Sequence, residues 1–194
     1  MILGLTGKNA AGKGEVANYL KSKGFAYCSL SDELREEATK GSIGHSRESL
    51  INLGNELRGK YGPNYLARKI NNKINQAKKL RSERNFFVVD SIRSPFEVEE
   101  LRKNRDFILV GVDAPIELRF ERLLKRDRLG DAKTLVDFKL QEEMENLKDD
   151  TNQQLDKCLE MADKIIVNDG ELEDIHKKID RLLEELKQQN STHL

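Results

Sequence analysis

Short apolar runs alternate along the chain with longer segments whose apolar residues recur at helical spacing. Each run is rich in Val, Ile, Leu or Phe and is bounded by polar residues or glycine, which predicts a short buried strand. Five such strands are predicted, at residues 2–6, 25–30, 86–90, 107–112 and 164–167. The most apolar of them ends in Phe86-Phe87-Val88-Val89-Asp90.

The segments between and after these strands predict helices. Pro95 and Pro115 stand at the start of two of them, where the missing N–H of proline is tolerated. The last helix carries its leucines and isoleucines on one stripe, as expected for a helix packed on a core. The predicted helices span residues 14–23, 31–39, 46–60, 64–79, 95–103, 115–126, 138–147 and 172–186.

This alternation predicts an α/β fold with three layers and a mainly parallel sheet. The chain has 194 residues, 37% of them hydrophobic, which suits a single domain spanning 1–194. Parallel sheets bind ligands at the carboxyl ends of their strands. We therefore expect functional residues just after Thr6, Leu30, Asp90, Val112 and Val167.

Charge and cysteine content narrow the functional classes. Lys+Arg and Asp+Glu are balanced at 34 each, so net charge gives no reason to expect nucleic acid as a partner. No apolar run reaches the roughly 20 residues that a membrane span needs. Cys28 and Cys158 lie far apart in the sequence and outside metal-ligand spacing. Two such cysteines are typical of a protein in a reducing compartment. We expect a cytoplasmic protein with small-molecule partners and no membrane partner, and the oligomeric state stays open.

A glycine-rich loop follows the first strand and opens the first helix. Its sequence, Gly7-Lys8-Asn9-Ala10-Ala11-Gly12-Lys13-Gly14, matches G-x-x-x-x-G-K. Such a loop turns backbone N–H groups inward around phosphate oxygens, and the helix behind it favours anions. The lysine, here Lys13, reaches the β- and γ-phosphates. The sequence therefore predicts a P-loop that binds a nucleoside triphosphate.

The loop departs from the common pattern at the residue after Lys13. The Ser or Thr that usually holds Mg²⁺ at this place is Gly14, and Glu15 follows it. We expect Mg²⁺ to be held by phosphates, by water and by a carboxylate elsewhere. Asp90, directly after an apolar strand, is our candidate, acting through water or on the acceptor. The role of Glu15 stays open at this stage.

Charged residues also follow the second and third strands. Asp32 and Arg35 lie one helical turn apart, either as acceptor-binding residues or as a surface ion pair with a helix cap. Arg93 comes three residues after Asp90 and could grip a phosphate with two hydrogen bonds. We expect these side chains to serve the acceptor.

Arginines gather on the helix predicted at 115–126 and just beyond it. Arg119, Arg122 and Arg126 share one face of that helix, and Arg128 follows. Such a group suits a lid that neutralises charge on a phosphoryl group in transfer, although a solvated charged face is the alternative. After the fifth strand, Asn168-Asp169-Gly170 predicts a turn that could bind the nucleotide base.

Taken together, these segments resemble P-loop nucleotide kinases of the adenylate-kinase-like and dephospho-coenzyme-A-kinase-like types. The resemblance spans nearly the whole chain and is strongest to a group of predicted nucleotide kinases of archaea and some bacteria. The segments that carry it are Gly4–Glu15, Asn52–Arg58 and Asp90–Arg93. The P-loop is specific for triphosphate binding, and the other segments are specific for this group.

The resemblance implies a sheet order of 2-3-1-4-5, a helical acceptor-binding region at about 31–80 and a lid at about 125–140. It implies that Lys13, Asp90, Arg122 and Arg126 are catalytic. It places Asp32, Arg35, Arg58 and Arg93 at the acceptor. The residues implied at the ATP site are Gly7, Lys8, Asn9, Ala10, Ala11, Gly12, Lys13, Gly14, Glu15, Arg128, Asn168, Asp169 and Gly170.

The sequence thus predicts a kinase that uses ATP as phosphoryl donor with Mg²⁺ and acts on a small nucleotide. A (deoxy)nucleoside monophosphate is the favoured acceptor, and dephospho-coenzyme A is the alternative. Two interpretations of other classes stay open: an NTPase switch that binds a protein partner, and a nucleotide-binding regulator without catalysis. The missing Ser/Thr after Lys13 and the arginine-rich helix disfavour the switch.

Overall fold

The sheet has five parallel strands in the order β2-β3-β1-β4-β5, which confirms the predicted α/β fold and strand order. The computed structural model describes residues 1–80, 86–127, 130–145 and 154–191. The strands are β1 (Ile2–Gly7), β2 (Ala26–Ser29), β3 (Phe87–Asp90), β4 (Phe107–Asp113) and β5 (Lys164–Val167).

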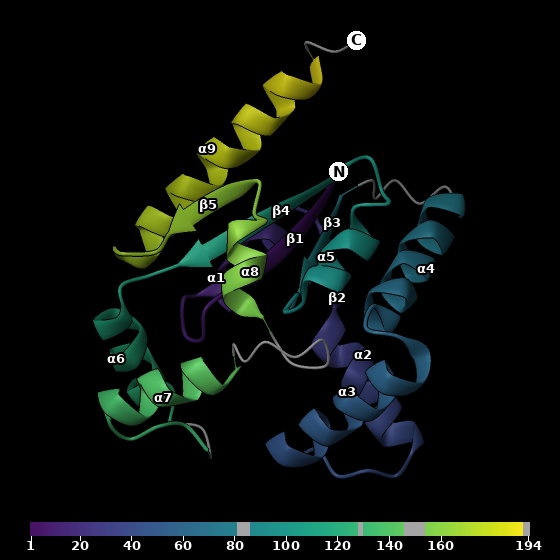
Figure 1. The fold of residues 1–194 in the computed structure, drawn as a ribbon. Coiled ribbons are helices and arrows are strands. Elements are labelled where there is room, and N and C mark those ends of the chain that lie inside the picture. Colours follow the sequence, from purple (N-terminus) through teal and green to yellow (C-terminus); the bar gives the residue numbers. More distant parts are fainter. Residues whose placement is uncertain (81–85, 128–129, 146–153, 192–194) are drawn as a thin grey trace.

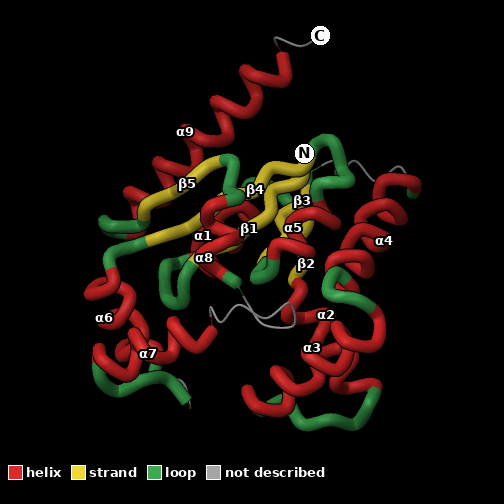
Figure 2. Tube along the Cα trace, viewed as in Figure 1, coloured by secondary structure: helices red, strands yellow, loops and turns green. Residues whose placement is uncertain are grey.

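Helices connect the strands and cover both faces of the sheet, as Figure 2 shows. They are α1 (Lys13–Ser22), α2 (Leu30–Lys40), α3 (Arg47–Tyr61), α4 (Tyr65–Lys79), α5 (Pro95–Leu101), α6 (Ile116–Arg126), α7 (Leu135–Glu145), α8 (Leu155–Glu160) and α9 (Leu172–Ser191). Within the described residues, no helix is both long enough and apolar enough to cross a membrane.

The side chains of β1 alternate between two hydrophobic cores. Leu3 and Leu5 pack with α1 and α9 on one face, whereas Ile2 packs with α4, α5 and α8 on the other. This arrangement makes the sheet the middle of three layers (Figure 1). Strands buried on both faces are the reason that the runs are continuously apolar.

Two groups of helices extend beyond the carboxyl ends of the strands (Figure 1). One group is α2, α3 and α4, joined by a small core around Ala38, Leu53 and Leu57. The other is α6 and α7, joined around Leu123 and Phe138, and this second core also includes Ala10 of the glycine-rich loop. The first group lies within the implied acceptor-binding range of about 31–80, whereas the implied lid range of about 125–140 includes only the end of α6 and the first part of α7.

The structure differs from several predicted helix bounds, and α9 ends at Ser191 rather than at Leu186. Helix α8 was not predicted, because six residues are too few to show a helical period. Helix α7 begins at Leu135, three residues before the predicted start, and the end predicted at Leu147 lies outside the described residues. Helix α2 is capped by Ser29, whose side chain accepts a hydrogen bond from the Asp32 N–H, so Ser31 lies inside the helix.

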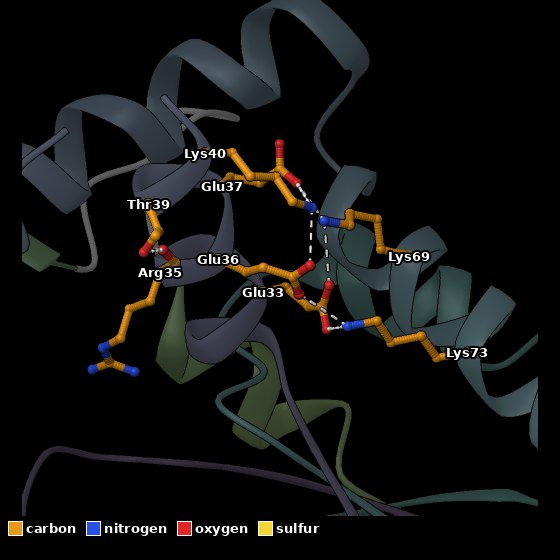
Figure 3. Close-up of polar contacts among 8 residues, drawn as sticks. All are labelled: Glu33, Arg35, Glu36, Glu37, Thr39, Lys40, Lys69 and Lys73. Carbon is orange, nitrogen blue, oxygen red and sulfur yellow. Dashed lines mark hydrogen bonds and ion pairs between the residues drawn. The ribbon is translucent and has the colours of Figure 1, made fainter. Parts of the chain in front are cut away.

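Ion pairs fasten α2 to α4 (Figure 3). Glu33 of α2 is 4% exposed, and its carboxylate pairs with both Lys69 and Lys73 of α4. Lys69 also reaches Glu37 at 2.5 Å, and Lys73 also reaches Glu36 at 3.1 Å. A network that shares its charges and partly buries one carboxylate holds helices together better than isolated surface pairs do.

We predict that Lys73→Met lowers the free energy of unfolding by about 1 kcal/mol, since it takes one of two cations from a buried carboxylate. Urea denaturation measures this difference. Lys79→Met is the matched control: Lys79 is exposed on the same helix, and it has no recorded ion partner among the described residues. We expect a change below about 0.5 kcal/mol there, and equal losses in both variants would contradict the prediction.

Candidate active site

The glycine-rich loop depends on two glycines with positive φ. Gly7 has φ 142°, and a Cβ added to it would lie 2.0 Å from the carbonyl oxygen of Val112 on β4. Gly12 has φ 102°, and its added Cβ would lie 2.2 Å from the Asn168 side-chain nitrogen. L-residues with side chains rarely adopt such φ values, and neither place has room for a side chain. Glycine is therefore required at both ends of the loop.

Helix α1 begins where the glycine-rich loop ends. It begins at Lys13, and Gly12 at the cap position offers no side chain to accept from those amides. An uncapped helix start is a favourable place for an anion. A Cβ added to Gly14 would meet nothing within 4 Å, so the surface beside the first turn is open.

Lys13 lies across the loop rather than away from it. Its ammonium donates to the carbonyl oxygens of Gly7 at 2.7 Å and of Lys8 at 2.8 Å. These contacts hold the positive charge beside the uncapped amides, where it adds to the attraction for a polyanion. Lys8 itself pairs with Asp156 of α8 at 3.6 Å.

Asn168 ties the loop to two other elements. Its side-chain amide donates to the Ala11 carbonyl at 2.9 Å, and its backbone N–H donates to the Asp113 carbonyl at 2.7 Å. Its own carbonyl accepts from Arg122 of α6 at 3.0 Å. Asn168 is 7% exposed, so these bonds form away from water. The loop, the end of β4 and the arginine helix thus share one buried residue.

The arginines of α6 also reach the loop directly, at Asn9. Arg126 donates to the Asn9 side-chain oxygen at 3.2 Å, and Arg119 donates to its backbone carbonyl at 3.4 Å. Arg126 is held by two hydrogen bonds to Asp131, and Arg119 is paired with Glu142 of α7. The predicted group of arginines is therefore brought together beside the loop, while Arg128 lies outside the described residues.

Asp169 turns away from the loop, although its neighbour Asn168 is part of the site. It pairs with Lys178 of α9 at 2.6 Å, and this hydrogen bond lowers the pKa of the Asp169 carboxyl. Gly170 follows at the surface. The predicted contact of Asp169 and Gly170 with a nucleotide base stays a prediction.

Asp90 ends β3 beside the start of α2. Its two carboxylate oxygens accept from the Ser91 N–H at 2.6 Å and from the Tyr27 hydroxyl at 3.3 Å. In the sheet Asp90 lies opposite Ser29, the residue that caps α2. The carboxylate is thus at the carboxyl edge of the sheet, as predicted. Tyr27, whose bond to it was not predicted, holds it in place.

Arg58 and Arg93 both act electrostatically on a buried carboxylate. Glu97 is 4% exposed and accepts from the backbone N–H groups of Arg93 at 2.8 Å and Ser94 at 3.1 Å. Burial raises the pKa of Glu97, opposed by these hydrogen bonds and by the positive charges of Arg58 and Arg93. Burial also disfavours the charged form of Arg58 and so lowers its pKa, and the negative charge of Glu97 opposes this shift. The structure therefore groups Arg58 from α3 with Arg93 after β3.

Asp32 and Arg35 form the ion pair that their spacing suggested. They lie 2.9 Å apart on α2, with side chains 58% and 50% exposed. In Figure 3 Arg35 points away from α4, on the side of α2 opposite the glutamates of the ion-pair network. The predicted role of the pair at an acceptor stays a prediction.

Glu15, whose role the sequence left open, contacts α9. Its carboxylate lies 2.9 Å from His176 Nε2, and the His176 ring stacks on Tyr19 of α1. Sequence reasoning missed both this pair and Glu97. The signal for Glu97 was present, since Ser94 and Glu97 match the S-x-x-E pattern of a helix start, but that pattern says nothing about two arginines nearby.

Comparison with known proteins identifies the family. A family model described as an AAA domain matches residues 3–134. A UPF0200 protein of Pyrococcus abyssi is 33% identical over 189 residues, covering 96% of this chain and 97% of the relative. One of Pyrococcus furiosus is 34% identical over 186 residues, covering 94% and 96%. The chain belongs to the UPF0200 family.

Solved structures extend the likeness to the fold of kinases. A protein of Thermus thermophilus superposes with a TM-score of 0.60 at 22% identity, covering 96% of this chain and 97% of its own. Shikimate kinase from Aquifex aeolicus superposes with a TM-score of 0.51 at 19% identity, covering 95% and 97%. This member of the UPF0200 family therefore has a P-loop kinase-like fold, with the five-stranded sheet order described above.

We predict that Gly12→Ala weakens ATP binding at least tenfold and lowers the free energy of unfolding by about 1–3 kcal/mol. The added methyl would strain a positive φ and displace the Asn168 amide. Calorimetric titration with Mg–ATP and urea denaturation measure the two effects.

Gly59→Ala is the matched control for this glycine. Gly59 is helical, and its added Cβ meets nothing within 4 Å. It should stabilise the protein by about 0.5–1 kcal/mol and leave ATP binding unchanged. If Gly12→Ala bound ATP as the wild type does, the described role of Gly12 would be wrong.

Proposed function

We propose that the protein is an ATP-dependent phosphotransferase that acts on a small nucleotide, a (deoxy)nucleoside monophosphate. The observation that carries the proposal is the arginine cluster of α6 at the glycine-rich loop. Arg119 and Arg126 donate to Asn9, and Arg122 reaches the loop through Asn168. A loop that only binds a triphosphate does not need several cations beside it, whereas a loop that transfers a phosphoryl group does.

The donor half of the site is suited to a triphosphate. The uncapped amides of α1, the Lys13 ammonium and the open surface at Gly14 offer donors and space on the same side of the loop. Bound Mg–ATP would supply the γ-phosphoryl group and a divalent charge that offsets its oxygens. In the proposal, Lys13 binds the β- and γ-phosphates, and Arg122 and Arg126 bind the equatorial oxygens during transfer.

The residues present fit a metal ion carried by the nucleotide rather than by the protein. Among the described residues, no group of three or more His, Cys, Asp or Glu side chains could hold a metal. Asp90 offers a carboxylate at this edge of the sheet, fixed by Tyr27 and Ser91. Mg²⁺ usually keeps several waters and takes one or two carboxylates plus phosphates. Asp90 would hold it through water.

The acceptor half rests on Arg58 and Arg93. Their two guanidinium groups act on a single buried carboxylate, Glu97, and together carry more positive charge than it offsets, which suits an acceptor that itself carries a phosphate. Asp32 and Arg35 on α2 would contact the rest of that acceptor. Positioning and electrostatics would supply most of the catalysis, with α6 and α7 excluding water from the transferred group.

The free cysteines, Cys28 and Cys158, agree with the cytoplasmic location that the sequence predicts.

We predict that Lys13→Ala lowers turnover at least about a hundredfold, in the range seen when a main electrostatic contact is lost. A coupled assay of ADP formation with the active acceptor measures this rate. Lys177→Ala is the control, since Lys177 is exposed on α9 and should leave turnover unchanged. Transfer at the wild-type rate by Lys13→Ala would sink the scheme.

The acceptor is found by screening ATP consumption against every ribo- and deoxynucleoside monophosphate and dephospho-coenzyme A. The proposal predicts stimulation by one or more monophosphates and no comparable effect of dephospho-coenzyme A. Stimulation by dephospho-coenzyme A alone would replace the acceptor but keep the reaction class. Hydrolysis that ignores every acceptor would replace the kinase with an NTPase switch.

A further inference from the structure

A row of alternating side chains joins the loop helix α1 to the last helix α9. Glu15, Tyr19 and Lys23 recur every four residues on α1, and His176 and Asp180 do so on α9. His176 lies between Glu15 and Tyr19, and Asp180 lies between Tyr19 and Lys23, so the two helix faces interdigitate. This spacing matches that of neighbouring side chains on a helix.

The row fixes the direction of the His176 ring. Its centroid lies 3.9 Å from that of Tyr19, with the rings 10° from parallel, and the Tyr19 hydroxyl donates to Asp180 at 2.7 Å. Lys23 holds the other oxygen of Asp180 at 2.8 Å. Because its ring stacks on the Tyr19 ring, His176 is held with Nε2 toward the Glu15 carboxylate, 2.9 Å away.

Glu15 has reason to be held. It lies in the first turn of α1, and its N–H donates to the Gly12 carbonyl within the turn that follows the loop. A carboxylate there favours the empty helix start through the helix dipole, but it is a like charge close to any triphosphate bound at the same amides. The structure places the side chain at α9, against His176.

We propose that His176 is a positioning residue for nucleotide binding. It draws the Glu15 carboxylate onto α9 and thereby keeps a negative charge away from the triphosphate. The inference rests on the proposed function, since it presumes that ATP binds at the loop. It assigns work to a histidine of the last helix, 161 positions from Glu15 in the sequence.

The test is a double-mutant cycle on ATP affinity in the full chain. Calorimetric titration with Mg–ATP compares the wild type, His176→Ala, Glu15→Gln and the double variant. His176→Ala should weaken binding roughly three- to tenfold, as expected for one charge approaching a polyanion near a protein surface. Glu15→Gln should bind at least as tightly as the wild type, and the double variant should match Glu15→Gln, since no charge then needs holding.

Two further variants separate this role from packing. His176→Phe keeps a ring to stack on Tyr19 and loses the nitrogen, so it should weaken ATP binding as His176→Ala does. Tyr19→Phe keeps the ring and loses only the bond to Asp180, so it should bind ATP as the wild type does. Thermal unfolding of each variant reports packing separately, and a merely structural His176 would lower stability without rescue of affinity by Glu15→Gln.

The outcomes distinguish this inference from the proposed function. A wild type that binds no ATP would overturn the proposed function and the inference with it. If the wild type binds ATP, two results would overturn the inference alone. One is that His176→Ala lowers ATP affinity equally with and without Glu15→Gln. The other is that His176→Ala lowers ATP affinity in neither case. Loss from His176→Ala in the otherwise wild-type chain, with affinity restored when Glu15→Gln is added, supports it.

Discussion

The candidate site depends on the hydrogen bonds of one buried residue, Asn168. A glycine-rich loop around an anion has few internal contacts, so something outside it must hold its shape. The Asn168 side-chain amide does so by donating to the Ala11 carbonyl. It also lies so close to Gly12 that a Cβ there would clash with it. The same residue accepts from Arg122, and its backbone pairs with the end of β4. The loop and the arginines are thus placed relative to each other through one residue.

The two sides of the site use charge in different ways. On the loop side, the arginines are neutralised in part by Asp131 and Glu142, which hold the guanidinium groups near Asn9. On the acceptor side, the buried Glu97 is influenced by the charges of Arg58 and Arg93, and burial and attraction shift its pKa in opposite directions. Both arrangements keep cations fixed before a ligand arrives, which reduces the reorganisation that binding and catalysis require.

The fold could be predicted from the sequence because its signals are local. Apolar runs buried on both sheet faces identify the strands, the pattern around Lys13 identifies the P-loop, and the resemblance supplied the strand order. The pairing of Glu15 with His176 could not be predicted, since it joins residues 161 positions apart whose types fit many surface positions. The place of Glu97 in the site could not be predicted for another reason: the spacing of Ser94 and Glu97 is explained by the start of a helix alone. Helix α8 was too short to give a period.

The central claim is that this loop transfers a phosphoryl group rather than releasing it to water. The most direct measurement is a single-turnover reaction with ATP labelled at the γ-phosphorus, protein in excess, Mg²⁺ and a mixture of nucleoside monophosphates. Chromatography then separates labelled nucleotide from labelled inorganic phosphate. The account predicts that the label passes to a nucleotide acceptor, and that little appears as inorganic phosphate. Label found only in inorganic phosphate, at a rate that the acceptors do not change, would contradict it.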